Sequence, residues 1–151
     1  MKLQHSDYMD LALREAVLSL PKDVPVGCVI VRAGQLVAHG HNTREAAQDA
    51  LGHAELNAIR MACRRLNSWR LPECSIYITL EPCPMCMGAI LSARIPQIIF
   101  GAYDPKAGSC GSLLDLNASG FPSAAEILGG IREQQCSSLL SDFFRLQRSR
   151  P

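Results

Sequence analysis

Thr79-Leu80-Glu81-Pro82-Cys83-Pro84-Met85-Cys86 is the stretch around which the chain is organised, together with His53-Ala54-Glu55 upstream. Two cysteines spaced Cys-x-x-Cys at a helix start can direct both sulfurs to one metal ion, and free N–H groups there stabilise thiolate. One imidazole and two thiolates give zinc three protein ligands and leave its fourth position open for water, as in catalytic sites. Glu55, two residues from His53, is placed to carry protons without binding the metal.

A Cys-x-x-Cys pair alone has other interpretations, because redox sites and structural zinc sites also use it. The chain has seven cysteines but no second close pair to complete a four-thiolate site, and the pair lacks the aromatic-glycine context of a redox motif. His-x-Glu upstream and Pro82 before Cys83 instead match the His-x-Glu and Pro-Cys-x-x-Cys signature of zinc nucleobase deaminases. The sequence therefore favours a zinc hydrolase.

The composition is that of one globular domain. The chain has 151 residues, of which 48% are hydrophobic and 19% charged, so we expect a single domain over residues 1–151. A net charge of +1 excludes a strong uniform field for nucleic acid but not a local basic patch. The first residues lack an apolar secretion segment, no apolar run is long enough to span a membrane, and the cysteines lack disulfide-like spacing. We therefore expect a cytoplasmic protein with no membrane partner.

Apolar periodicity predicts an alternation of helices and strands. Helices are expected from Ser6 as the N-cap to about Leu20, over residues 53–66, from Pro84, and over residues 131–147. Strands are expected over residues 28–31, 36–38, 74–80 and 95–100, and residues 124–128 read as either a weak fifth strand or a helical turn. A strand, a helix and a strand in this order predict parallel pairing, which places both metal-binding helix starts at one sheet edge. Gly27 indicates a close backbone approach, at a bulge or at a pocket wall.

From Val24 almost to Arg148 the chain resembles the bacterial tRNA adenosine deaminases of the cytidine-deaminase superfamily. Besides the zinc signature, the resemblance rests on Val24-Pro25-Val26-Gly27, His41-Asn42, Phe100-Gly101-Ala102 with Asp104 and Lys106, and Leu140-Ser141-Asp142-Phe143-Phe144-Arg145. It implies an α/β protein with a three-layer α/β/α fold, in which helices flank a central mixed sheet of about five strands. It also implies a homodimer with one Zn²⁺ per subunit that converts adenosine to inosine at the wobble position of a tRNA anticodon loop.

The same resemblance implies a role for particular side chains. His53, Cys83 and Cys86 would hold zinc, and Glu55 would move protons. Asn42 would contact the flipped base, and the backbone N–H groups of Ala54 and Cys83 would lie near the reacting water. Val26 and Ile78 would form the pocket wall. The flanking nucleotides of the anticodon stem-loop would be contacted by Asp104, Lys106 and Phe144.

Other substrates and functions remain open at this point. The family has an Asn-His pair after a short helix where this chain has Gly120-Phe121-Pro122-Ser123-Ala124, and this chain lacks the family's basic tail. These departures leave open a deaminase of a free nucleobase or nucleoside, or of adenine or cytosine in single-stranded DNA. An RNA-binding module with a structural zinc ion is a further alternative, against which the Glu55 carboxylate argues.

Overall fold

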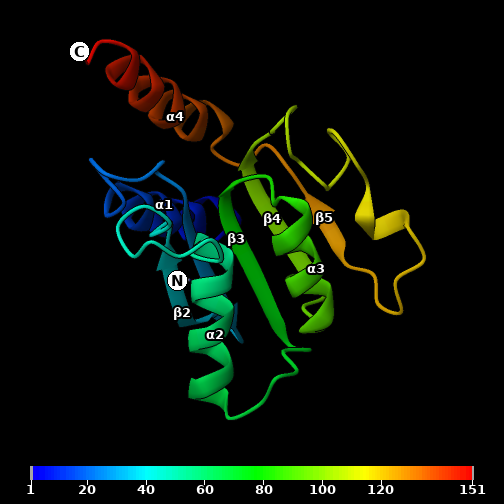
Figure 1. The fold of residues 1–151 in the computed structure, drawn as a ribbon. Helices are drawn as coiled ribbons and strands as arrows, with labels where there is room; N and C mark the ends of the chain where they lie inside the picture. The colour runs from blue at the N-terminus through cyan, green and yellow to red at the C-terminus, as the bar shows by residue number, and fades with distance from the viewer. Residues whose placement is uncertain (1, 151) are drawn as a thin grey trace.

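A computed structural model describes residues 2–150, whose elements alternate between helices and strands (Figure 1). The α-helices are α1 (His5–Val17), α2 (Ala54–Leu66), α3 (Pro84–Ser92) and α4 (Glu133–Arg148). The strands are β1 (Gly27–Arg32), β2 (Gln35–His41), β3 (Cys74–Leu80), β4 (Gln97–Ala102) and β5 (Glu126–Leu128), with a 3₁₀ turn η1 (Leu116–Ala118) before β5. Of the two interpretations of residues 124–128, a weak strand or a helical turn, the structure shows the strand.

The strands form one mixed sheet in the order β2-β1-β3-β4-β5. β1 pairs antiparallel with β2 and β3, whereas β3, β4 and β5 pair in parallel. Ala33 and Gly34, with φ of 50° and 77°, make the tight turn between β1 and β2, because a two-residue hairpin loop favours positive φ at both positions. Helix α3 joins β3 to β4, as parallel neighbours require a crossover. The predicted parallel pairing is confirmed.

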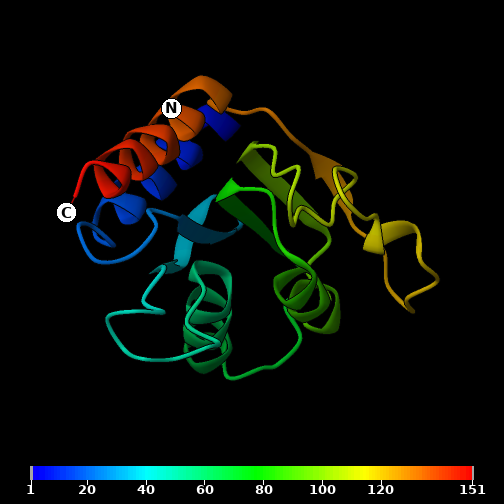
Figure 2. The same cartoon turned by 45° about the horizontal axis from the view of Figure 1, so that its top comes forward.

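Helices cover both faces of the sheet, which gives the three layers that were expected (Figures 1 and 2). Side chains alternate along β3, so Ile76 and Ile78 face one side and Tyr77 the other. The first side packs against α2 and α3, through Ala54, Ala58, Ala62, Met87, Ile90 and Leu91. The second packs against α1 and α4, through Tyr8, Met9, Ala12 and Cys136.

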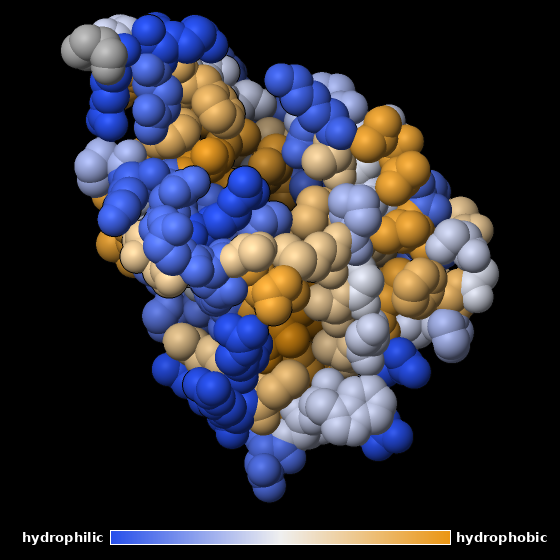
Figure 3. Space-filling view, viewed as in Figure 1, coloured by the Kyte–Doolittle hydropathy of each residue, from blue (hydrophilic) through white to orange (hydrophobic). Residues whose placement is uncertain are grey.

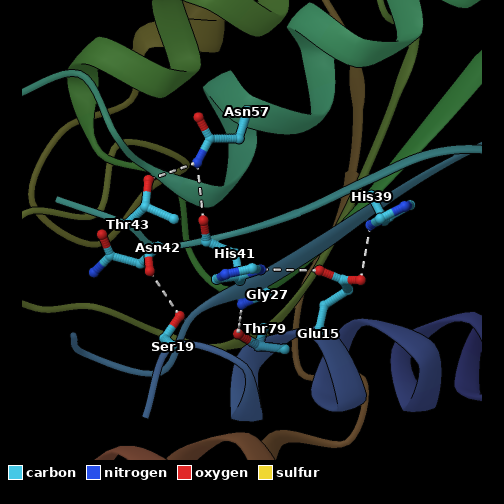
Figure 4. Close-up of polar contacts among 9 residues, drawn as sticks. All are labelled: Glu15, Ser19, Gly27, His39, His41, Asn42, Thr43, Asn57 and Thr79. Carbon is cyan, nitrogen blue, oxygen red and sulfur yellow. Dashed lines mark hydrogen bonds and ion pairs between the residues drawn. The ribbon is translucent and has the colours of Figure 1, made fainter. Parts of the chain in front are cut away.

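Gly27 lies where β1 passes beneath α1. A Cβ atom at this position would come within 2.0 Å of the Ala12 carbonyl oxygen and 2.4 Å of the Ala16 nitrogen. Its N–H donates to Thr79 Oγ1 at 3.1 Å, which ties β1 to β3 (Figure 4). The predicted close approach is therefore to a helix, and the irregularity in the β1–β2 pairing falls further along, between Ile30 and Val31.

The starts of α2 and α3 lie side by side at the edge of the sheet where β3 ends (Figure 1). Parallel α/β sheets place their ligand sites beyond the carboxyl ends of their strands, and this edge carries the signature residues. Within residues 2–150, the helices are all too short or too polar to cross a membrane.

Candidate metal centre and base pocket

His53, Cys83 and Cys86 form the cluster that the sequence predicted. Their ligand atoms all lie within 4.8 Å of one another. His53 Nδ1 is 3.6 Å from Cys83 Sγ and 3.4 Å from Cys86 Sγ. Two thiolates and one imidazole are a donor set that suits zinc. The residues present therefore fit a single zinc ion with one coordination position left for a non-protein ligand.

The local sequence explains why these atoms converge. His53 and Cys83 are the N-cap residues of α2 and α3, both with extended backbone. Pro84 takes the first position of α3, where its fixed φ and missing N–H suit a helix start. Cys86 lies three residues after Cys83, on the same side of the first turn. The start of α2 thus supplies one ligand, and the start of α3 supplies two ligands, to the same metal position.

The hydrogen bond between the two thiols shifts their pKa values in opposite directions. A hydrogen bond from Cys86, together with one from His53, lowers the pKa of Cys83 to about 4, although burial opposes this. The hydrogen bond to Cys83 and burial raise the pKa of Cys86 above its ordinary value. The lowered pKa favours thiolate at Cys83, which is the form of cysteine that binds a metal ion.

Glu55 lies in the first turn of α2 and is 4% exposed. Burial raises its pKa to about 7, and the nearby Cys83 thiolate adds to the increase, while a backbone hydrogen bond and His53 oppose it. A carboxyl group whose pKa lies near neutrality can both accept and release a proton at physiological pH. Glu55 is therefore chemically equipped as a general acid and base beside the metal ligands.

A cavity of about 190 Å³ opens onto these residues. It is lined by Val24, Val26, Asn42, Arg44, His53, Ala54, Glu55, Leu80, Glu81, Cys83, Asp104 and Ala107. Pockets for drug-sized ligands begin at roughly 300 Å³, so this cavity suits a single base rather than a whole nucleotide. Apolar side chains, polar side chains and Glu55 all border the space that a planar ring would occupy.

The comparison with known proteins agrees with this geometry. The model of the cytidine and deoxycytidylate deaminase zinc-binding region matches residues 2–102. Over 145 residues the chain is 43% identical to the tRNA-specific adenosine deaminase of Bacillus subtilis, which covers 95% of this chain and 90% of that protein. The chain belongs to the tRNA-specific adenosine deaminases of this family.

Two solved structures place the deaminase within the family. One comes from studies of A-to-I editing by tRNA:A34 deaminases at the wobble position of transfer RNA. It is 37% identical, with a TM-score of 0.85 over 89% of this chain and 99% of that chain. The guanine deaminase of Bacillus subtilis is 35% identical, with a TM-score of 0.61 over 79% of this chain and 71% of that chain. The fold of this chain is therefore more similar to that of the tRNA deaminase, by both TM-score and coverage.

Asn42 lines the cavity of this deaminase, but backbone groups hold much of its side chain. Its Nδ2 donates to the Val24 carbonyl at 3.1 Å and its Oδ1 accepts from the Arg44 N–H at 3.1 Å. Ser19 Oγ also donates to the Asn42 carbonyl at 2.9 Å (Figure 4). An amide has two donors and two acceptor positions, so one of each remains for a base, in a fixed orientation.

Ile78 does not line the cavity, in contrast to the expectation for it. It is fully buried between the sheet and the α2/α3 layer, and Leu80 forms the wall instead. Both side chains face the same side of β3 because they are two residues apart, and Leu80 is the one nearer the helix starts. Val26, expected as a wall residue, lines the cavity, and Ala54 lines it too.

The residues expected to contact flanking nucleotides lie in two places. Asp104 borders the cavity itself, and its Oδ1 accepts from the Lys106 and Ala107 N–H groups at 3.0 and 3.3 Å. Lys106 and Phe144 line a separate groove along α4, with Ser141, Gln147 and Arg148. A further groove contains Lys22, Phe143 and Gln147 and shares Val24, Asn42 and Arg44 with the cavity.

Sequence reasoning missed several wall residues. Val24 stands inside a quoted motif, and Arg44 and Ala107 lie within two residues of quoted motif residues, so their positions could have been inferred from the motifs. Glu81 stands inside the quoted stretch, yet nothing in its local pattern distinguishes it from a spacer.

His39 and His41 lie apart from the metal cluster and contact Glu15 instead, at 2.8 and 3.3 Å (Figure 4).

Proposed function

We propose that this protein hydrolyses the amino group of adenosine at the wobble position of a tRNA anticodon loop, yielding inosine and ammonia. The observation that carries the proposal is the buried Glu55, which lines a base-sized cavity together with His53 and Cys83 of the metal-ligand cluster. The similarity to a tRNA-specific adenosine deaminase over 95% of the chain supports adenosine in tRNA as the substrate.

Glu55 performs the proton transfers of the reaction. His53, Cys83 and Cys86 would hold a zinc ion, which would polarise the attacking water when bound. Glu55 accepts a proton from the attacking water and delivers it to N1 of the adenine. It then moves the second water proton to the departing amino group, so that ammonia leaves and a C6 carbonyl remains. Transfer by a positioned carboxyl group contributes about 10²–10⁴-fold to the rate.

The pocket residues bind and orient the base. The target nucleotide must leave the anticodon stack, at a cost of a few kcal/mol. Val26, Leu80 and Ala54 provide apolar and backbone walls, and the remaining donor and acceptor of Asn42 hold the polar edge of the ring. Asp104, Lys106 and Phe144 contact the nucleotides on either side of the extruded base, whose backbone runs past α4.

The assembly belongs to the same proposal. Figure 3 shows apolar side chains gathered near α3 and on the loop beside it. Leu113 and Leu114, which precede η1, are exposed. A second copy of this chain would remove such a surface from water, which supports a homodimer of single-domain subunits of residues 1–151. We place this protein in the cytoplasm, where its tRNA substrate is found. Light scattering of the zinc-loaded protein measures its oligomeric state.

An assay on an anticodon stem-loop tests the function. Purified zinc-loaded protein is incubated with a stem-loop that carries adenosine at the wobble position, and inosine is measured by mass spectrometry. A stem-loop with guanosine at that position, free adenine, guanine and cytosine, and a single-stranded DNA of the same sequence are run in parallel. Inosine from the first substrate alone supports the proposal. Deamination of free guanine with no inosine in RNA would reject it.

A further inference from the structure

A loop of residues 103–112 packs against the segment that leads into α3, and four of its hydrogen bonds converge on one carboxylate. Glu81 is 2% exposed. Its Oε1 accepts from the Asp104 N–H at 3.1 Å and also from the Ser112 hydroxyl. Its Oε2 accepts from the N–H groups of Cys110 at 3.0 Å and Ser112 at 3.2 Å. Four donors from both ends of the loop therefore meet at the Glu81 carboxylate.

The same loop also holds the peptide group just before Cys83. The carbonyl of Pro82 accepts from the Ser109 N–H at 2.9 Å and from the Ser109 hydroxyl at 2.8 Å. Ser109 is fully buried. Glu81 and Pro82, adjacent in sequence, thus fix both the loop and the start of the metal-binding helix relative to each other.

The fit between loop and carboxylate leaves no spare room. A Cβ atom on Gly108 would lie 2.4 Å from Glu81 Cδ and 2.5 Å from the Asp104 carbonyl oxygen. The Gly108 N–H donates to that carbonyl at 2.8 Å, and Asp104 Oδ1 accepts two further N–H groups of the turn. The first half of the loop is therefore a turn held together by its own hydrogen bonds. Its position relative to the rest of the protein is fixed by its contact with Glu81.

This turn carries part of the base pocket. Asp104 and Ala107 line the cavity on the side of Glu81, while Val26, just before β1, and Asn42, just after β2, also line it. A displacement of the turn would therefore change the shape of the cavity without touching His53, Glu55 or the cysteines. The same displacement would move Lys106, which lies between the two lining residues in sequence.

We propose that Glu81 is a positioning residue for substrate recognition: its buried carboxylate fixes the 103–112 loop and thereby sets the width of the base pocket. The inference rests on the proposed function, because the pocket must receive a base from RNA. A carboxylate suits this task better than a neutral side chain, since both of its oxygens accept hydrogen bonds and charge strengthens each of them. An amide in its place would turn an NH₂ group toward a backbone N–H.

Glu81→Gln tests the inference through the separation of KM from kcat. We expect KM for the anticodon stem-loop to rise about tenfold, the scale of one lost charge-assisted hydrogen bond, with kcat within about threefold and zinc content unchanged. Amide hydrogen exchange should accelerate at residues 104, 110 and 112 but not in β3 or β4. A purely structural role would instead lower the active fraction, and therefore the apparent kcat, at constant KM.

Two further variants guard against misfolding and nonspecific effects. Gly108→Ala keeps Glu81 but pushes the turn away from it, so it should raise KM in the same direction. Ser68→Ala removes a serine hydroxyl hydrogen bond in the loop after α2, outside the Glu81 cluster, and should leave KM within about twofold. An unchanged KM in both Glu81→Gln and Gly108→Ala, or loss of zinc from Glu81→Gln, overturns the positioning role. A wild-type protein that forms no inosine in the stem-loop overturns the proposed function itself.

Discussion

At the scale of single residues, Glu55 can be separated from the metal ligands by experiment. It lies two residues from His53 but is not one of the three clustered ligands. We expect Glu55→Gln to retain zinc and to lower kcat by about 10²–10⁴-fold, because an amide cannot accept and release the protons of the reaction. Inosine formation under saturating stem-loop, with zinc measured by atomic emission, checks both statements. Glu133→Gln, in the first turn of α4, is the matched control and should keep full activity.

The metal ligands make a second prediction at this scale. Chelation of zinc should abolish activity, and added Zn²⁺ should restore it. Chelation should also lower the melting temperature of the protein, because a ligand that binds only the folded state stabilises that state. Cys83→Ala should reproduce the loss of zinc and of activity. Cys63→Ala is the control, because Cys63 is a half-buried thiol of α2 outside the cluster. Full activity in zinc-free protein would contradict the assignment.

At the scale of elements, the contact between β1 and α1 depends on one missing side chain. Gly27→Ala should destabilise the protein by about 1–3 kcal/mol, because the added methyl group would overlap the backbone of α1 at Ala12 and Ala16. Ala33→Gly, in the β1–β2 turn, should be neutral or stabilising, since Ala33 has a φ of 50°. Urea unfolding of both variants measures the difference. Equal stability of Gly27→Ala and wild type would show that α1 can move away.

The starts of α2 and α3 could be predicted from the sequence, whereas the start of α1 could not. His53 and Cys83 precede α2 and α3 as expected, because proline, cysteine and histidine there have a chemical reason to be at a helix start. Ser6, expected as the N-cap of α1, lies inside the helix instead. The helix begins at His5, and the Gln4 N–H donates to Asp7 Oδ2 at 2.7 Å. Apolar spacing cannot reveal which of several polar residues takes the cap.

At the scale of the whole molecule, the contacts between segments distant in the sequence could not be predicted. The metal centre was predictable because its spacing is short within each half of the motif. The partners of Glu81 lie 23 to 31 residues downstream, in a loop without regular structure, so no local pattern announces them. Leu80 replaces Ile78 as the pocket wall for a similar reason, since only the fold shows where along β3 the cavity opens.

The distribution of charge over the molecule bears on RNA binding more than the net charge does. The net charge is +1, yet Lys22, Arg44, Lys106 and Arg148 line the two grooves that flank the site. If these four side chains neutralise phosphates of a single strand, at ~0.7 per contact, log(kcat/KM) for the stem-loop should fall with log[salt] with a slope of about −3. Lys106→Ala should make the slope shallower by ~0.7, whereas Lys2→Ala, outside both grooves, should not change it. A slope near zero in the wild type would mean that the grooves hold no RNA backbone and that recognition rests on the base pocket alone.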